Sequence, residues 1–326
     1  MNRALATLVF TALASAQSAQ TFQFPESAGA ADRNAMETIA VTVAGARVSL
    51  DRTRPTMTIS GTAESLSAAE WLFHQLEQPA GTGGTATTLH YGKPFGERSE
   101  EIAIFIIPAA TPTDAVGPLI TAIRAAADVQ WIFAHPGAKA IAARAAPKAI
   151  AEAEWIVKQI LPSDGRIPTA DSPSYPVDPS NEIRIFRMPP ESTNGELTEV
   201  WKALQKVEDP GQRVFPLNAT KSLIIRSSTE NVALAGWLVH ELAKPPGNTP
   251  HQTTLAHSDD DGVRLFFLAS DSASTDVAAI VDNIKALADT QRVFAFSKPF
   301  AVLVRGRSAQ ISTAEGVISN FVPIAH

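Results

Sequence analysis

The chain of 326 residues is 45% hydrophobic and 18% charged, the balance of a globular protein rather than a disordered one. Its formal net charge of -6 argues against a non-specific nucleic-acid binder, because such a protein needs a basic face to meet phosphates. Cysteine is absent, which excludes disulfides, thiol nucleophiles and the cysteine-linked lipid anchor of a bacterial lipoprotein.

The first twenty residues have the pattern of a secretory signal peptide. Residues 1–3 are a short basic start, 4–13 are an apolar run, and Ala14-Ser15-Ala16 is an A-x-A cleavage site. The run is too short for an ordinary transmembrane helix, and no later stretch reaches spanning length without charges. We expect a soluble mature protein in the periplasm or outside the cell, without membrane insertion; an uncleaved anchor is the alternative.

One predicted helix occurs four times and organises the whole chain. Its copies lie at 69–79, 153–162, 235–245 and 314–323, and each ends at a proline. Ser228 is a predicted N-cap of the third copy, and Pro147 is the predicted first helical residue of the second. The conserved position of the first three copies is a tryptophan that we expect in the structural core: Trp71, Trp155 and Trp237.

A predicted hairpin precedes each copy of this helix. Its first strand is predicted over 47–51, 129–133, 213–217 and 292–296. Apolar residues at every second position mark the second strand, which indicates one buried face. These residues are Met57 and Ile59, Ile141 and Ala143, Leu223 and Ile225, and Val302 and Val304.

An amphipathic helix and another strand come before each hairpin. Apolar residues spaced three and four apart place the helix over 36–43, 116–123, 197–207 and 277–287. The strand is predicted over 22–24, 102–107, 183–188 and 263–268. The predicted fold class is therefore α+β, with four tandem βαββα modules.

The modules themselves are predicted to be a duplicated pair. Thr87-Thr88-Leu89 matches Thr253-Thr254-Leu255 at the spacing that separates Trp71 from Trp237. A segment rich in Pro, Asp and Ser would join the two halves. The predicted boundaries are 1–20 for the signal peptide, 21–80 for module 1, 81–162 for module 2, 163–180 for the linker, 181–246 for module 3 and 247–326 for module 4.

The stretch from Ile183 to Pro245 resembles the short, repeated N-terminal domains of bacterial secretins, the NolW-like modules. The matching features are the strand 183–186, the helix 197–207, the segment from Asn218 to Arg226 and the helix 230–242. The resemblance implies a compact βαββα fold of the secretin N1 or KH-like kind, which packs against copies of itself. In secretins such modules line the periplasmic vestibule and contact other secretion or pilus components. The resemblance does not extend to the secretin pore, so pore formation is not implied.

No catalytic constellation, cofactor site or metal site is predicted. His74 and His240 stand at equivalent helix positions, which indicates either a pair of sites or a helix-flank residue inherited by duplication. The second reading is favoured, because the other two copies have Lys158 and Ser319 there. The acidic run 257–262 lacks the closing glutamate of an EF-hand and is predicted to be a solvated turn.

One polar position repeats in three modules as Arg144, Arg226 and Arg305, whereas the first module has Ser60. An arginine at a strand end can bind a carboxylate on a partner or on a neighbouring module. A solvent-facing strand end is the alternative. We expect these arginines to bind a partner, so that replacing Arg226 and Arg305 by alanine weakens capture and leaves the thermal midpoint nearly unchanged.

The sequence therefore predicts a non-enzymatic interaction or scaffold protein of the periplasm, in envelope or secretion-type assemblies. It would act through strand edges and helix faces, on a protein partner of the cell envelope or on a second copy of itself. One alternative is a binder of a small molecule or glycan in a cleft between the duplicated halves. The other is an enzyme with an unrecognised carboxylate site.

Overall fold

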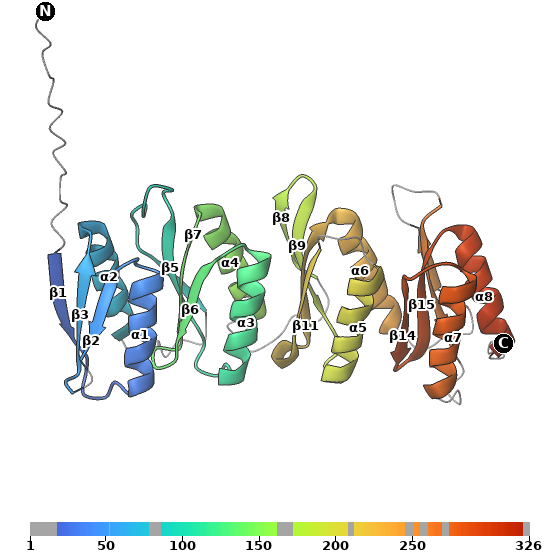
Figure 1. Cartoon of the computed structure of the whole chain (residues 1–326), viewed down its shortest axis with the longest axis horizontal. Helices are drawn as coiled ribbons and strands as arrows, with labels where there is room; N and C mark the ends of the chain where they lie inside the picture. The colour runs from blue at the N-terminus through green and yellow to red at the C-terminus, as the bar shows by residue number, and fades with distance from the viewer. Residues whose placement is uncertain are drawn as a thin grey trace, which may run out of the picture. The chain divides into compact units, whose positions relative to one another are not determined.

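The computed structural model describes residues 18–51, 53–77, 86–161, 172–207, 212–244, 251–254, 260–268 and 274–321. In this part of the chain the fold is α+β, with eight helices and four small antiparallel sheets (Figure 1). The α+β class predicted from the sequence is confirmed. The predicted signal peptide up to residue 17, the first half of the predicted linker and the first half of the acidic run 257–262 lie outside the described residues.

The first sheet has three strands in the order β1-β3-β2, and the second has four in the order β4-β5-β7-β6. The strands of the first sheet and their two helices are β1 (Ser18–Gln23), α1 (Ala30–Thr42), β2 (Arg47–Leu50), β3 (Thr56–Gly61) and α2 (Ala63–Glu77). Those that follow are β4 (Thr87–His90), β5 (Glu101–Ile106), α3 (Thr113–Ala126), β6 (Trp131–His135), β7 (Ala140–Ala145) and α4 (Pro147–Ile160).

The third and fourth sheets repeat the second, in the orders β10-β11-β9-β8 and β12-β13-β15-β14. The third sheet's elements are β8 (Ser174–Asp178), β9 (Asn181–Arg187), α5 (Asn194–Val207), β10 (Arg213–Leu217), β11 (Ser222–Ser228) and α6 (Thr229–Leu242). The fourth sheet's elements are β12 (His251–Thr254), β13 (Gly262–Phe267), α7 (Ser274–Leu287), β14 (Val293–Ser297), β15 (Phe300–Gly306) and α8 (Ser308–Phe321).

Three short edge strands were not predicted from the sequence. β4, β8 and β12 each pair antiparallel with the strand that follows, and β8 lies in the predicted linker. Strands this short carry little apolar alternation of their own, so the neighbouring strand decides their conformation. Local signals did locate the helix starts: Ser228 Oγ accepts from Asn231 N–H at 3.3 Å, and α4 begins at Pro147.

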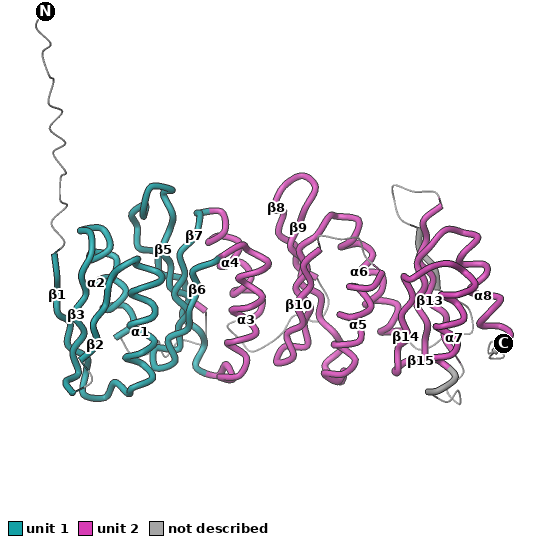
Figure 2. Tube along the Cα trace, in the orientation of Figure 1, with its two compact units in different colours: residues 1–82, 87–109, 130–147 teal, residues 83–86, 110–129, 148–326 magenta. Residues whose placement is uncertain are grey.

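The chain divides into two compact units (Figure 2). Unit 1 contains residues 1–82, 87–109 and 130–147, and unit 2 contains 83–86, 110–129 and 148–326. The division passes through the predicted second module, whose sheet belongs to unit 1 and whose helices α3 and α4 belong almost wholly to unit 2.

In unit 1, helices α1 and α2 lie between the first and second sheets (Figure 1). Met57 and Ile59 of β3 point into this core, whereas Thr58 and Ser60 on the opposite face of β3 are only half-buried. This alternation is typical of a sheet with one buried face. The second sheet contributes Ile102, Ile104, Ala140 and Ala142 to the same core.

In unit 2, both faces of the fourth sheet are buried. Leu303 packs into the core that α5 and α6 form with the third sheet. Val302 and Val304 point the other way, into a core with α7 and α8. Because successive strand residues face opposite sides, β15 is a nearly continuous apolar run rather than an alternating one.

The three tryptophans lie at the borders of the cores rather than inside them. Each is half-buried, and Trp71 and Trp237 pack against the outside of the unit 1 and unit 2 cores. The Trp71 ring meets Tyr91 with centroids 5.6 Å apart, and Trp155 meets Tyr175 at the same distance. These tyrosine contacts were not predicted from the sequence, because β4, which precedes Tyr91, and β8, which contains Tyr175, were not predicted.

Candidate functional site

The three repeated arginines lie where a helix ends against the sheet that follows it. Each guanidinium donates to a backbone carbonyl at the C-terminal end of the helix, where carbonyls have no intrahelical partner and the helix dipole is negative. The acceptors are Val43, the residue after α1, for Arg144 (2.8 Å), Ala126 of α3 for Arg226 (2.6 Å) and Val207 of α5 for Arg305 (2.8 Å). We call these contacts the arginine locks.

Each arginine lock also contains an acidic partner. Arg144 Nε lies 3.1 Å from Glu100 Oε2, Arg226 Nη1 lies 3.0 Å from Asp128 Oδ2 and 3.2 Å from Glu152 Oε2, and Arg305 Nη2 donates to Asp261 Oδ2 at 2.7 Å. Sequence reasoning missed these acids. One signal was present, because the acids of the first and third locks stand at the same distance before their arginines, 44 residues.

The structure therefore places all three guanidinium groups on contacts within the chain, of the kind expected between neighbouring modules. Arg305 is the most enclosed, with 2% of its surface exposed. Partner binding by these arginines stays a prediction. At the equivalent position of the first sheet Ser60 lies on the polar face of β3, which no helix covers in the described part of unit 1.

The second lock contains a titratable group whose environment favours its neutral form. Glu152 is 2% exposed, and burial raises the pKa of its carboxyl, an effect that Arg226 and Lys148 reduce. A raised folded-state pKa means that the folded protein binds this proton more tightly than the unfolded chain does. Glu152 thus contributes stability at low pH and loses that contribution as the pH rises through its folded-state pKa.

We expect this titration to appear as a pH-dependent difference between the wild type and Glu152→Gln. The free energy of unfolding of the wild type, measured against the variant, should rise as pH is lowered from 7 to about 4.3, the ordinary glutamate pKa. Urea unfolding at several pH values measures the difference. A difference that shrinks toward low pH would mean that Arg226 outweighs burial and holds this pKa below its ordinary value.

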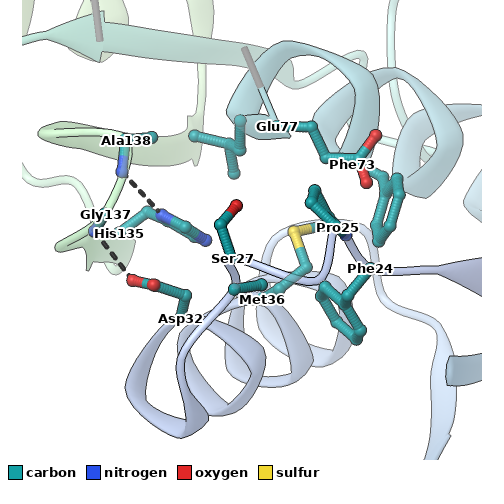
Figure 3. Close-up of a pocket in the computed structure, with 12 residues that line it drawn as sticks. Phe24, Pro25, Ser27, Asp32, Met36, Phe73, Glu77, His135, Gly137 and Ala138 are labelled. Atoms are coloured by element: carbon teal, nitrogen blue, oxygen red, sulfur yellow. Dashed lines mark hydrogen bonds between the residues drawn. The ribbon is translucent and has the colours of Figure 1, made fainter. Parts of the chain in front are cut away.

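A cavity of about 560 Å³ lies in unit 1, between the start of α1, the end of α2 and the turn from β6 to β7 (Figure 3). Its apolar wall is formed by Phe24, Met36, Phe73 and Leu76. The polar groups around it include Asp32, His135 and Glu77, and Figure 3 shows the two carboxylates on opposite sides. An apolar cavity with a few polar groups is the usual form of a ligand site.

Hydrogen bonds hold the turn side of this cavity. Gly137 N donates to Asp32 Oδ1 at 2.8 Å, and Ala138 N donates to His135 Nδ1 at 3.1 Å. Because Nδ1 accepts a hydrogen bond, the His135 imidazole is neutral in this arrangement. Burial lowers the pKa of His135, and the negative charge of Asp32 opposes this effect. A Cβ at Gly137 would lie 2.5 Å from Asp32 Oδ1, so only glycine permits this approach.

The structure does not bring the predicted candidate histidines together. His74 and His240 are exposed on their helices, and His74 Nε2 lies 4.0 Å from Glu70 one turn earlier. Within the described residues, no group of three or more His, Asp or Glu side chains could hold a metal ion. None of the described helices has the length and hydropathy of a membrane span.

The first sheet has an edge that the other three sheets cover. β5, β9 and β13 each have an additional strand on their outer side, whereas β1 pairs only with β3 in the described residues. β1 has neither charge nor proline, the features that usually protect an edge from pairing. It therefore presents a row of backbone donors and acceptors to another strand.

The register shows which backbone groups of β1 face this edge. Phe24 N donates to Pro55 O at 2.7 Å, which continues the β1–β3 pairing. In an antiparallel ladder, residues whose N–H and C=O groups bond the partner strand alternate with residues whose N–H and C=O groups point away from it. The residues whose N–H and C=O groups point to the open edge are Ala19, Thr21 and Gln23, and all three are exposed.

Comparison with known proteins shows a distant likeness to a solved structure. No protein-family model matches this chain, and no curated protein matches it. Among solved structures, Aeromonas hydrophila ExeD, a secretin, is similar over 73% of this chain, with 13% sequence identity and a TM-score of 0.17. The match spans 41% of the ExeD chain. At this identity and TM-score the likeness assigns neither a family nor a function.

Proposed function

We propose that this chain is an exported, non-enzymatic interaction scaffold of the cell envelope, built from four βαββα modules. Its binding element is the open edge of β1, which takes up an extended segment of a protein partner by antiparallel strand addition. Main-chain hydrogen bonds give affinity in this mode of recognition, and side chains on alternate positions give specificity.

The observation that carries the proposal is the unequal completion of the sheets. Three sheets end on the additional strands β4, β8 and β12, and the first sheet lacks the equivalent strand in the described residues. In each of the other three sheets a short strand pairs antiparallel with the strand equivalent to β1, which supports strand addition at the β1 edge. The arginine locks support the scaffold role, because they hold a helix end against the following sheet.

Replacing Thr21 by proline is expected to abolish partner capture, because proline removes an outward N–H of β1 without removing a bond to β3. Thr21→Val is the matched control, since it keeps the N–H and removes only the hydroxyl that lies 3.2 Å from Thr58 Oγ1. Parallel pull-downs from envelope extract should retain the same protein with wild type and Thr21→Val, and lose it with Thr21→Pro.

Hydrogen exchange on the recovered complex should then show protected amides at Ala19, Thr21 and Gln23. Capture that persists with Thr21→Pro, or a complex that leaves these amides unprotected, would contradict strand addition at β1. Analytical ultracentrifugation of the chain alone tests whether the partner is a second copy of the chain. Self-association of the wild type that Thr21→Pro removes would identify the partner as a second copy.

A second candidate function is ligand binding, favoured by the cavity in unit 1. Its lining residues all lie between Phe24 and Ala138. The cavity is therefore within the first predicted half of the chain, and it is separate from the cleft between halves that the sequence suggested.

A further inference from the structure

The turn that closes the unit 1 cavity has a counterpart in unit 2. Asp32 in α1 and Glu196 in α5 stand at the same distance before the carbonyls of their arginine locks, Val43 and Val207. Gly137 and Lys298 likewise stand at the same distance before the lock arginines of their sheets. The two turns therefore meet their preceding helices in equivalent ways.

In unit 2 the turn residue equivalent to Gly137 is Lys298, and its side chain reaches the helix acid. Lys298 Nζ lies 3.3 Å from Glu196 Oε1, and the neighbouring Ser297 N donates to Glu199 Oε2 at 3.0 Å. The helix acid thus binds an ammonium group supplied by the next turn. In unit 1 the equivalent residue is Gly137, which has no side chain to offer.

Within the described residues, neither acid of the unit 1 cavity forms an ion pair with a lysine or an arginine. Among the described residues, Asp32 accepts from the backbone N–H groups of Gly137 and Gly29. Glu77 forms no ion pair with any described residue, and partial burial raises the pKa of its carboxyl although it is exposed at the rim. As the last residue of α2, Glu77 also lies at the negative end of the helix dipole.

We propose that this cavity binds a primary ammonium group carried on an apolar chain of about the length of a lysine side chain. The apolar chain lies against Phe24, Met36 and Phe73, and the Asp32 carboxylate holds the ammonium. The Glu77 carboxylate, on the opposite side of the cavity, adds negative charge that favours a cation there. This site is independent of the β1 edge. Its ligand is either a lysine of a partner protein or a free amine, since the two present the same chemistry.

Titration of the mature full-length chain with n-hexylamine, followed by amide chemical shifts, tests the site. Hexylammonium should shift the amides of the turn at Gly137 and of the end of α2, and 1-hexanol, of similar shape but neutral, should bind at least about tenfold more weakly. Equal binding of the two probes, or no binding of hexylammonium at millimolar concentration, would overturn the proposal.

Matched variants locate the charge. Asp32→Asn combined with Glu77→Gln should weaken hexylammonium binding at least about tenfold, whereas Glu37→Gln with Glu70→Gln, on the same helices outside the cavity, should not change it. Ser27→Trp should block the cavity and abolish binding. Unchanged binding by the Asp32/Glu77 double variant would refute the assignment.

A pair of capped tripeptides separates the two sources of the ligand. Acetyl-Ala-Lys-Ala-amide that competes with hexylamine, with a norleucine analogue that does not, identifies a protein lysine as an acceptable ligand. Competition by neither peptide restricts the site to free amines. Thr21→Pro should leave every one of these titrations unchanged, so failure of strand addition at β1 and failure of this site give different results.

Discussion

Replacing Arg305 by alanine is expected to lower the free energy of unfolding of unit 2 by about 3–5 kcal/mol. The side chain is 2% exposed, and it donates to Val207 O and to Asp261. Its removal leaves a buried carbonyl and a carboxylate without their donor, and the cost of an unpaired buried group exceeds the net value of the original bond. Urea unfolding followed by tryptophan fluorescence measures the loss.

Arg307 provides the matched control for this variant. It lies two residues further along the chain and is exposed, so Arg307→Ala should change the free energy of unfolding by no more than about 0.5 kcal/mol. The expected loss at Arg305 departs from the sequence-based expectation, in which the arginines act on a partner and the thermal midpoint barely moves. An unchanged midpoint for Arg305→Ala would show that the third lock does not stabilise unit 2.

Leu303→Ala is expected to cost about 2–5 kcal/mol, because Leu303 is fully buried between the fourth sheet and helices α5 and α6. The truncation leaves a cavity in a core formed by two sheets and the helices between them. The equivalent residue of the first sheet is Thr58, on its uncovered face. Thr58→Ala should therefore cost no more than about 0.5 kcal/mol.

Thermal and urea unfolding of both variants test this contrast. The same strand position is buried in the fourth sheet and half-buried, on an uncovered face, in the first. Similar losses at Leu303 and Thr58 would mean that the polar face of the first sheet is covered in solution, and a loss below about 1 kcal/mol at Leu303 would contradict the two-sided core.

Apart from the edge strands β4, β8 and β12, the order of strands and helices was determined by the sequence alone, because its causes are local. Met57 and Ile59 mark one face of β3 through their spacing, and Ser228 caps α6 through a bond to Asn231 three residues away. Such signals act within a single turn or strand. They needed no knowledge of what packs on the other side.

The roles of particular side chains were decided only by the tertiary structure. Arg226 meets Ala126 across 100 residues of sequence, and no local pattern distinguishes a helix-end carbonyl from a partner's carboxylate as its acceptor. Trp71 and Trp155 each meet a tyrosine that lies later in the chain, Tyr91 and Tyr175. The cavity in unit 1 exists because the turn at Gly137 closes against Asp32, 105 residues earlier. Periodicity specifies which face of an element is apolar, but the identity of the group that covers that face depends on packing between distant segments.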